Sequence, residues 1–243
     1  MAVENNNPDE IEPRQKIGDN EQNDPEDIVR VLPLKSRYPQ GAEKVLVQAC
    51  TGRVIPMGKL PADVGCLVMN VTSVAFLAHY LKTGMPLVRK RVTIDGSAVE
   101  YPKNVIVPIG TKISEVISFC GGYKKPPRKI LMGGPMMGLA VTTDELPILK
   151  QNNGILAFAE EDSLLPEPTQ CIRCGRCVAG CPMRLSPTLL EKYAALKDTE
   201  QLEKLGIMCC MECGTCVYNC PAGRPLVQAI RMGKAMIRKA GKK

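Results

Sequence analysis

The feature that most constrains this chain is a cysteine run that occurs twice. The first copy, residues 171–182, reads CIRCGRCVAGCP, and the second, residues 210–221, reads CMECGTCVYNCP. Both have the spacing C-x2-C-x2-C-x3-C-P, with a glycine after the second cysteine. Nine of the twelve cysteines of the 243-residue chain lie between Cys171 and Cys220. Because reducing compartments disfavour disulfides, cysteines clustered in this way favour metal or redox chemistry.

The spacing of each run fits a four-iron, four-sulfur cluster. A C-x2-C-x2-C loop presents three thiolates, and in two-cluster modules the fourth comes from the C-P cysteine of the opposite copy. The sequence therefore predicts two clusters with crossed ligands. One set is Cys171, Cys174, Cys177 and Cys220, and the other is Cys210, Cys213, Cys216 and Cys181.

Two zinc sites are the alternative, since zinc also takes four cysteine thiolates, usually from two separated C-x2-C pairs. A run that already holds four cysteines, and is repeated, favours the iron–sulfur interpretation. Cys209 is predicted to be a packed thiol beside the ligands. Cys50, Cys66 and Cys120 stand alone in apolar surroundings and are predicted core thiols. The only histidine, His79, is predicted to be structural, and nothing in the sequence supplies a nucleophilic triad.

Upstream of the cysteines, the hydrophobic pattern alternates between strand and helix periods. The predicted strands are residues 28–33, 63–69, 88–94, 105–107 and 130–132, and the predicted helices are residues 42–49, 71–82 and 113–119, with one more near 8–16. In the cysteine-rich part, a helix should begin at Pro187 with Ser186 as its cap. A last helix is predicted over 225–240, with its basic residues on the outer side.

These patterns divide the chain into three parts. Residues 1–86 indicate half of an α/β layer, residues 87–140 a small α+β module of the β-grasp kind, and residues 171–243 a helical two-cluster module. Residues 141–170, with two prolines near their end, are the predicted linker. The two methionines of the Gly-Gly-Pro-Met-Met-Gly run at 133–138 are either core filler or a surface packed on the cluster module, and core filler is favoured.

Charge and composition limit the kinds of partner that the chain is expected to bind. The net charge is +7, and residues 221–243 carry seven Lys or Arg and no acid, while residues 1–30 carry nine Asp or Glu. Such a basic tail is a solvated terminus or a surface for anionic lipid, an acidic protein or nucleic acid. Only 4% of residues are aromatic, which argues against base stacking and nucleic acid binding. No stretch reaches about 18 apolar residues and the first residues are too polar for a secretory signal, so we expect a cytoplasmic protein without a transmembrane segment.

Several motifs resemble those of a known family. They are KSRYPQGAEKVL at 35–46, TGRVIP at 51–56, LPADVG at 60–65, NVT at 70–72, MGGPMMG at 132–138, NGI at 153–155 and CIRCGRC at 171–177. Together they are similar to the C subunit of the Rnf electron transport complex, also called the ion-translocating oxidoreductase complex. The resemblance covers most of the chain and is more specific than the cysteine runs alone.

The resemblance implies a peripheral subunit on the cytoplasmic face of a bacterial membrane. Its complex couples electron exchange between ferredoxin and NAD to ion pumping, so the other Rnf subunits, ferredoxin and NADH are the implied partners. The family is similar to the flavin-binding subunit of respiratory complex I, which implies FMN and an SLBB-like module over 87–140. By that likeness, Tyr38, Gly41, Glu43, Asn70 and Thr72 match positions lining the flavin and nicotinamide pocket.

The chain departs from the family in one respect. Family members carry a glycine-rich loop and an acidic nucleotide-binding stretch upstream of the position of Tyr38, and neither is found here. Because a phosphate cradle needs backbone N–H groups at a helix N-terminus, we expect a partial flavin/NADH-type domain that belongs to a longer product or relies on another chain. The isolated chain should then bind little FMN and lack NADH oxidation activity.

Three functions remain open from the sequence. The first is an electron-transfer subunit of an Rnf-type translocase. The second is a ferredoxin-like relay or binding module without flavin chemistry. The third is a zinc-stabilised interaction protein. Iron and sulfide content separates the third from the others, and flavin content separates the first from the second.

Overall fold

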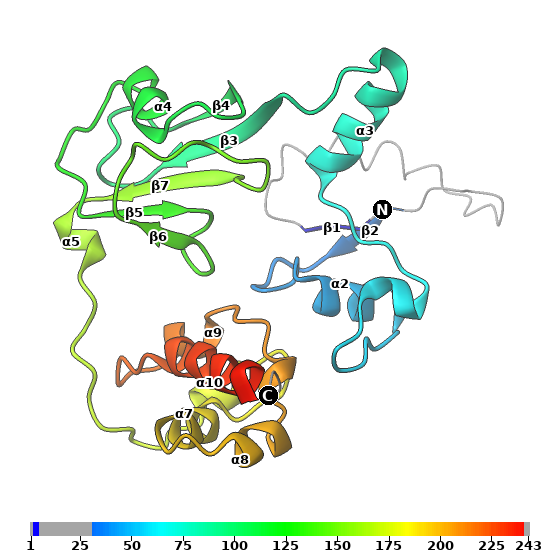
Figure 1. Ribbon diagram of the computed structural model, residues 1–243, viewed down its shortest axis with the longest axis vertical. Helices are drawn as coiled ribbons and strands as arrows, with labels where there is room; N and C mark the ends of the chain where they lie inside the picture. The colour runs from blue at the N-terminus through cyan, green and yellow to red at the C-terminus, as the bar shows by residue number, and fades with distance from the viewer. Residues whose placement is uncertain (1, 5–30, 241–243) are drawn as a thin grey trace. The chain divides into compact units, whose positions relative to one another are not determined.

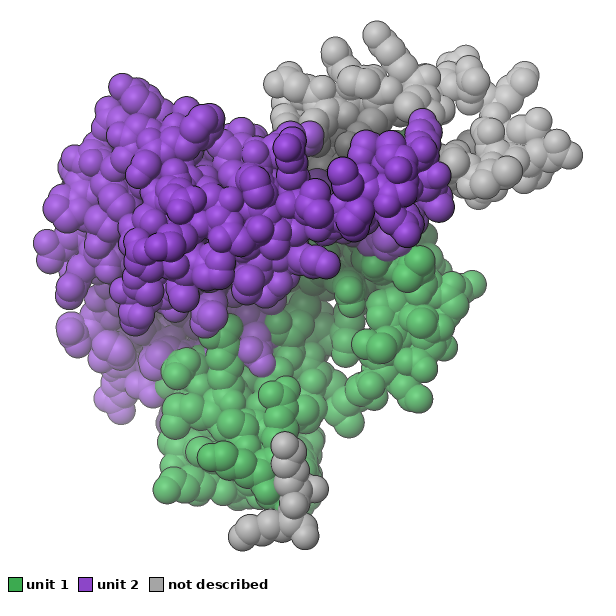
Figure 2. Space-filling model, turned by 45° about the horizontal axis from the view of Figure 1, so that its top comes forward, with its two compact units in different colours: residues 1–68, 175–211, 228–243 green, residues 69–174, 212–227 purple. Residues whose placement is uncertain are grey.

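The computed structural model describes residues 2–4 and 31–240 (Figure 1). The helix expected near residues 8–16 and the first part of the strand expected at 28–33 lie outside the described residues. The chain divides into two compact units, shown in different colours in Figure 2. One comprises residues 1–68, 175–211 and 228–243, and the other residues 69–174 and 212–227.

The first stretch of the chain forms a small strand pair and a helix. Strand β1 (Ala2–Glu4) pairs in parallel with β2 (Leu32–Leu34). Helix α2 (Glu43–Thr51) confirms the helix predicted at 42–49. It ends at Gly52, whose left-handed backbone, φ 70°, is a common way to terminate a helix.

The strand predicted at 63–69 is wrong. Residues Pro61–Val64 instead form the 3-10 helix η1. Pro61 begins it, and the carboxylate of Asp63 accepts a hydrogen bond from the Leu60 N–H at 2.7 Å, which closes the turn locally. The apolar residues that suggested a strand are not buried: Leu67 is 83% exposed.

Helix α3 (Val71–Thr83) confirms the helix predicted at 71–82. Asn70 caps it, because its side-chain oxygen accepts the Thr72 N–H at 2.9 Å. The apolar residues of α3 are largely solvent-exposed, as Leu77 at 43% and Leu81 at 76% show. Within the described part of residues 1–86, only Val47 and Ile55 are buried.

A five-stranded sheet forms the centre of the second unit. Its strands are β3 (Arg89–Asp95), β4 (Lys103–Pro108), β5 (Lys129–Met132), β6 (Leu139–Val141) and β7 (Gly154–Phe158), in the order β4-β3-β7-β5-β6. The β3–β7 pair is parallel and the other three pairs are antiparallel. Helix α4 (Ile113–Phe119) packs its buried side chains into the core of this sheet. The strands predicted at 88–94, 105–107 and 130–132 and the helix at 113–119 are therefore confirmed.

The stretch 141–170, expected as a linker, contributes to this sheet. Strand β7 lies between β3 and β5, so the sheet continues to Phe158 rather than ending near residue 140. Ile155 and Ala157 are fully buried in its core. The linker prediction missed this strand because the parallel partner that completes its pairing, β3, lies about sixty residues earlier in the chain.

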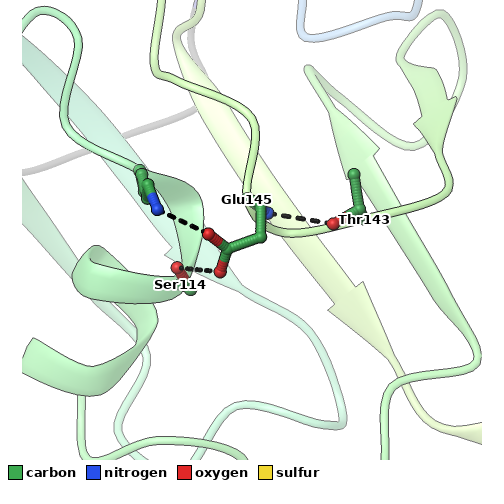
Figure 3. Close-up of polar contacts among 4 residues, drawn as sticks. Ser114, Thr143 and Glu145 are labelled. Carbon is green, nitrogen blue, oxygen red and sulfur yellow. Dashed lines mark hydrogen bonds and ion pairs between the residues drawn. The ribbon is translucent and has the colours of Figure 1, made fainter.

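The start of α4 is fixed by the segment that follows β6. The Ile113 and Ser114 N–H groups donate to the carbonyls of Leu146 and Asp144, at 3.0 and 2.8 Å, which satisfies donors that a helix start leaves unpaired. Figure 3 shows Glu145, whose carboxylate accepts from the Ser114 hydroxyl at 3.1 Å and from the Lys112 ammonium at 2.6 Å. The hydrogen bond from Lys112 is the main reason that the pKa of Glu145 lies below its usual value.

The cysteine-rich part is helical. Its elements are α5 (Glu160–Ser163), α6 (Arg176–Ala179), α7 (Pro187–Ala195), α8 (Thr199–Lys204), η2 (Ile207–Cys209), α9 (Thr215–Tyr218) and α10 (Leu226–Ala240). Helix α7 begins at Pro187 as predicted, although the Ser186 side chain makes no capping hydrogen bond. A small core forms around Leu190, Leu202 and Ile230. Among residues 2–4 and 31–240, no helix has the length and apolar character that a bilayer crossing requires.

Candidate metal centre

The two cysteine runs have the same backbone conformation. The residue before the second cysteine has a positive φ in both copies, 57° at Arg173 and 59° at Glu212. The glycine after that cysteine does as well, 75° at Gly175 and 85° at Gly214. Turns of this kind aim successive backbone N–H groups at one concave surface, an arrangement that binds anions and recurs at iron–sulfur sites. The repeat is thus one of backbone geometry as well as of sequence.

The structural repeat extends beyond the proline that closes each sequence repeat. Arg184 and Gly223, each three residues after the C-P cysteine, have φ values of 53° and 60°. Their N–H groups donate to the carbonyls of Cys181 and Cys220, at 3.0 and 3.2 Å. A left-handed conformation costs a non-glycine residue about 1–2 kcal/mol, and such strain persists where the surroundings enforce it. Arg173, Glu212 and Arg184 all have this left-handed conformation, which indicates that contacts around both loops hold the backbone in place.

The eight predicted ligands differ in exposure. Three are buried, namely Cys177, Cys213 and Cys216; four are half-buried, namely Cys171, Cys181, Cys210 and Cys220; and Cys174 is exposed. The glycines of the two loops differ in the same sense, since Gly214 is buried and Gly175 is exposed. The two loops share a conformation but not an environment.

The methionine run explains part of this difference. A Cβ built on Gly214 would lie 3.0 Å from the carbonyl oxygen of Met136 and 3.4 Å from its Cε atom. Met136 therefore packs against the ligand loop, and Met137 is 52% exposed. The core-filler prediction for these methionines is wrong, because the Gly-Gly-Pro-Met-Met-Gly turn leaves the sheet and covers the second cysteine loop.

The sequence-based prediction placed one lysine of the last helix on the wrong face. The basic residues of the last helix were expected on its outer side, but Lys234 on α10 is only 6% exposed. Its ammonium donates to the carbonyl oxygen of Cys210 at 2.5 Å. The signal for this position was its spacing, four residues after the buried Ile230, which places both side chains on one helix face.

The five residues of the expected flavin pocket fall into two groups. Tyr38 and Gly41 precede α2, and Glu43 is its first residue; all three are exposed. Asn70 and Thr72 start α3, where the Thr72 hydroxyl donates to the Asn70 side-chain oxygen at 2.6 Å. The first group belongs to one compact unit and the second to the other.

The remaining cysteines and the histidine have local roles. Cys120 is buried, as predicted, and burial raises the pKa of its thiol. Cys50 and Cys66 are only half-buried, since the segment around them holds few buried residues, and burial also raises the pKa of Cys50. Cys209 is half-buried in η2, and His79 is exposed on α3.

The donor chemistry fits two thiolate-bound clusters better than it fits single ions. Each loop offers three cysteines around a turn that gathers backbone N–H groups, with a fourth cysteine before the closing proline. In residues 2–4 and 31–240, no three His, Cys, Asp or Glu side chains lie at the spacing that one metal ion requires.

Known protein families match three consecutive stretches of the chain. The Nuo51 FMN-binding domain matches residues 1–79, the SLBB domain residues 91–140, and the 4Fe-4S dicluster domain residues 164–221. The matches agree with a layout of a flavin-type part, an SLBB part and a two-cluster part. They also favour iron–sulfur clusters over zinc.

Curated relatives cover nearly the whole chain. It is 43% identical over its full length to the C subunit of the proton-translocating ferredoxin:NAD(+) oxidoreductase complex of Clostridium ljungdahlii, and it covers 52% of that protein. It is 41% identical, over 98% of its length, to the Na(+)-translocating counterpart of Acetobacterium woodii, again covering 52%. The C subunit of the ion-translocating oxidoreductase complex of Methanosarcina acetivorans is 41% identical over 86% of the chain, which covers 47% of that protein. The chain spans about half the length of these relatives.

A solved structure shows a related fold. The crystal structure of the NAD+-reducing [NiFe]-hydrogenase in the H2-reduced state matches with a TM-score of 0.51 and 14% sequence identity. The match covers 85% of this chain and 43% of that one. At this identity the likeness concerns the fold alone.

Proposed function

We propose that this chain, a homologue of the C subunit of Rnf-type ion-translocating ferredoxin:NAD oxidoreductase complexes, transfers electrons within such a complex through two [4Fe-4S] clusters. The observation that carries the proposal is the pair of cysteine loops with equal left-handed turns at Arg173 and Gly175 and at Glu212 and Gly214. When bound, each cluster supplies single-electron acceptance and release. The rest of the chain holds the loops and controls their access to water.

The ligands are those that the crossed pattern assigns. Cys171, Cys174, Cys177 and Cys220 would hold one cluster, and Cys210, Cys213, Cys216 and Cys181 the other. In both copies the C-P cysteine lies two residues after a one-turn helix, α6 or α9, that contains the third cysteine of its loop, so the same helical step separates these two cysteines. This common step supports the same role for Cys181 and Cys220.

The division of the chain is part of the proposal. Residues 1–86 would be the C-terminal part of a flavin/NADH-type α/β domain, the module that starts at residue 87 would be a β-grasp fold, and residues 171–243 would be ferredoxin-like. A mixed sheet crossed by the single helix α4 supports the β-grasp assignment.

The flavin-type part lacks a core of its own among the described residues. Only Val47 and Ile55 are buried there, and α3 exposes Val74, Leu77 and Leu81. The Thr72 N–H in the first turn of α3, one of the groups that an anion would approach, is already bonded to the Asn70 side chain. By the family likeness we assign Tyr38, Gly41, Glu43, Asn70 and Thr72 to the wall residues of a flavin and nicotinamide pocket, which further polypeptide packing on the exposed apolar residues would complete.

Partners and location follow from the relatives. The proteins named above are subunits of complexes whose names describe ion translocation and ferredoxin:NAD oxidoreduction. For this chain we propose the same neighbours, with the chain held peripherally on the cytoplasmic face of the membrane. The second function is a ferredoxin-like relay without flavin chemistry. The solvent exposure of the residues assigned to the flavin pocket supports it, because these residues do not enclose a flavin by themselves.

Metal analysis and reduction separate these functions. After anaerobic reconstitution the chain should contain roughly eight iron and eight sulfide per polypeptide. Dithionite or reduced ferredoxin should bleach the cluster absorbance. Added FMN should bind weakly, and NADH should bleach nothing. Zinc in place of iron would reject the proposal, and stoichiometric FMN binding with fast bleaching by NADH would show that the wall alone forms a working pocket.

The crossed ligands are tested by one variant and one control. Cys220→Ala should damage the cluster held by Cys171, Cys174 and Cys177, whereas Cys209→Ala should leave both clusters intact. Mössbauer and EPR spectra of the two variants measure the outcome. Loss confined to the cluster held by the Cys210 loop would refute the crossed assignment.

A further inference from the structure

One face of α10 lies close against the core of the cysteine-rich part. Ile230 is buried on this face, and Gly233 follows it. A Cβ on Gly233 would lie 2.7 Å from the Cδ1 atom of Ile207 and 3.1 Å from the Cδ1 atom of Leu202. The glycine therefore lets α10 lie close to η2, where a larger residue would require the Ile207 and Leu202 side chains to shift. Element η2 leads directly into Cys210.

This close approach brings Lys234 onto the ligand segment. Its side chain occupies a position where the helix pattern expects an apolar residue, and it is only 6% exposed. Its ammonium donates to the Cys210 carbonyl oxygen at 2.5 Å. A cube held by four thiolates is a net anion, and reduction adds one more negative charge.

The repeat supplies an internal comparison. Counted from the C-P cysteine of each copy, Lys234 corresponds to Ala195, the exposed last residue of α7. The two loops have the same backbone turns, so the ligand geometry does not distinguish them. A buried positive charge next to Cys210, without a counterpart at Ala195, does.

We propose that Lys234 is a positioning residue that raises the reduction potential of the cluster held by Cys210. The inference rests on the proposed function, since it requires both clusters. A fixed cation stabilises the reduced, more negative form, and charge and hydrogen bonding near the ligands are established controls of cluster potential. Its bond to the carbonyl also fixes the orientation of the Cys210 backbone.

The test is an EPR-monitored redox titration of the full chain, reconstituted anaerobically with iron and sulfide. Lys234→Met removes the charge at nearly constant length, and Lys239→Met removes a charge from an exposed position of the same helix as the control. Lys234→Met should lower one midpoint potential by at least 59 mV, a tenfold change in the ratio of reduced to oxidised cluster. The midpoint potential of the other cluster should not change in Lys234→Met, and neither midpoint potential should change in Lys239→Met. Cys210→Ser, which changes one EPR signal, identifies the cluster concerned.

Two further variants keep the inference testable if Lys234→Met loses its clusters. Lys234→Gln retains a donor for the Cys210 carbonyl without the charge, and Lys234→Arg retains the charge. Lys234→Gln should lower the midpoint potential of the cluster held by Cys210, and Lys234→Arg should leave it unchanged. Equal shifts of both clusters, no shift in any variant, or the same drop with Arg as with Gln would overturn the inference. Failure of the unaltered chain to assemble clusters would instead count against the proposed function.

Discussion

Replacing Gly214 with alanine should destabilise the chain more than the same change at Gly175. The two glycines occupy the same place in the two cysteine loops and have φ values of 85° and 75°. Each variant therefore places an alanine in the left-handed region, which costs about 1–2 kcal/mol. This strain is common to both and cancels in the comparison.

The contact with Met136 makes the difference. A Cβ on Gly214 would lie 3.0 Å from the Met136 carbonyl oxygen, a backbone atom that cannot rotate away, whereas a Cβ on Gly175 meets no atom within 4 Å. Crowding of a packed site by one methyl group typically costs about 1–3 kcal/mol. Gly175→Ala should then lower the free energy of unfolding by about 1–2 kcal/mol, and Gly214→Ala by about 2–5 kcal/mol.

Urea unfolding followed by circular dichroism measures both variants under anaerobic conditions. Cluster absorbance recorded in the same titration shows whether the loop opens before the helices unfold. Equal losses of stability in the two variants would refute the contact between the methionine turn and the second loop. A larger loss for Gly175→Ala would reverse the assignment of the covered loop.

Three other outcomes follow from the described contacts. Gly96→Ala should prevent folding of the sheet, because its Cβ would lie 2.1 Å from the Ala157 carbonyl oxygen, while Gly110→Ala, also with positive φ but with open space, should fold; circular dichroism distinguishes them. Glu145→Gln should lower the thermal unfolding temperature at neutral pH. The difference from the unaltered chain should shrink as the pH falls through the lowered pKa of Glu145, because a carboxylate with a lowered pKa stabilises the fold only while it is ionised. A difference that does not change with pH would contradict this. Cys120 should resist iodoacetamide in the folded chain and react in urea, since burial raises its pKa, and mass spectrometry of the alkylated peptide reports it.

The elements that were predicted correctly carry their signals locally. Helix α3 has its cap in Asn70 and its stop in Gly84, and α4 matches its predicted bounds because its apolar residues recur at helical spacing. The cysteine spacing likewise predicts the donors from two short runs, and their crossed assignment to clusters stays a prediction. Each of these signals lies within about a dozen residues, the range over which periodicity and caps act.

The elements that were missed depend on distant partners or on competing local bonds. Strand β7 is a strand because β3 and β5 flank it, and its five residues show no period of their own. The strand expected at 63–69 does not form, because the hydrogen bond from the Leu60 N–H to the Asp63 carboxylate stabilises a 3-10 turn there instead. Lys234 is a charged residue type that usually lies on the solvated face of a helix, and its burial was indicated only by its spacing from Ile230.

The two cysteine loops show where such distant contacts affect function. Their sequences and backbone turns are the same where ligation requires it, because four thiolates on a cube leave little freedom. Their surroundings differ: Gly214 is covered by Met136, and Cys210 receives the Lys234 ammonium, while Gly175 and Cys174 are exposed. Since burial and nearby charge set cluster potentials, a repeated motif placed in unequal surroundings yields two unequal carriers. Under the proposed function, a difference between the two potentials would set the favoured direction of electron transfer between the clusters.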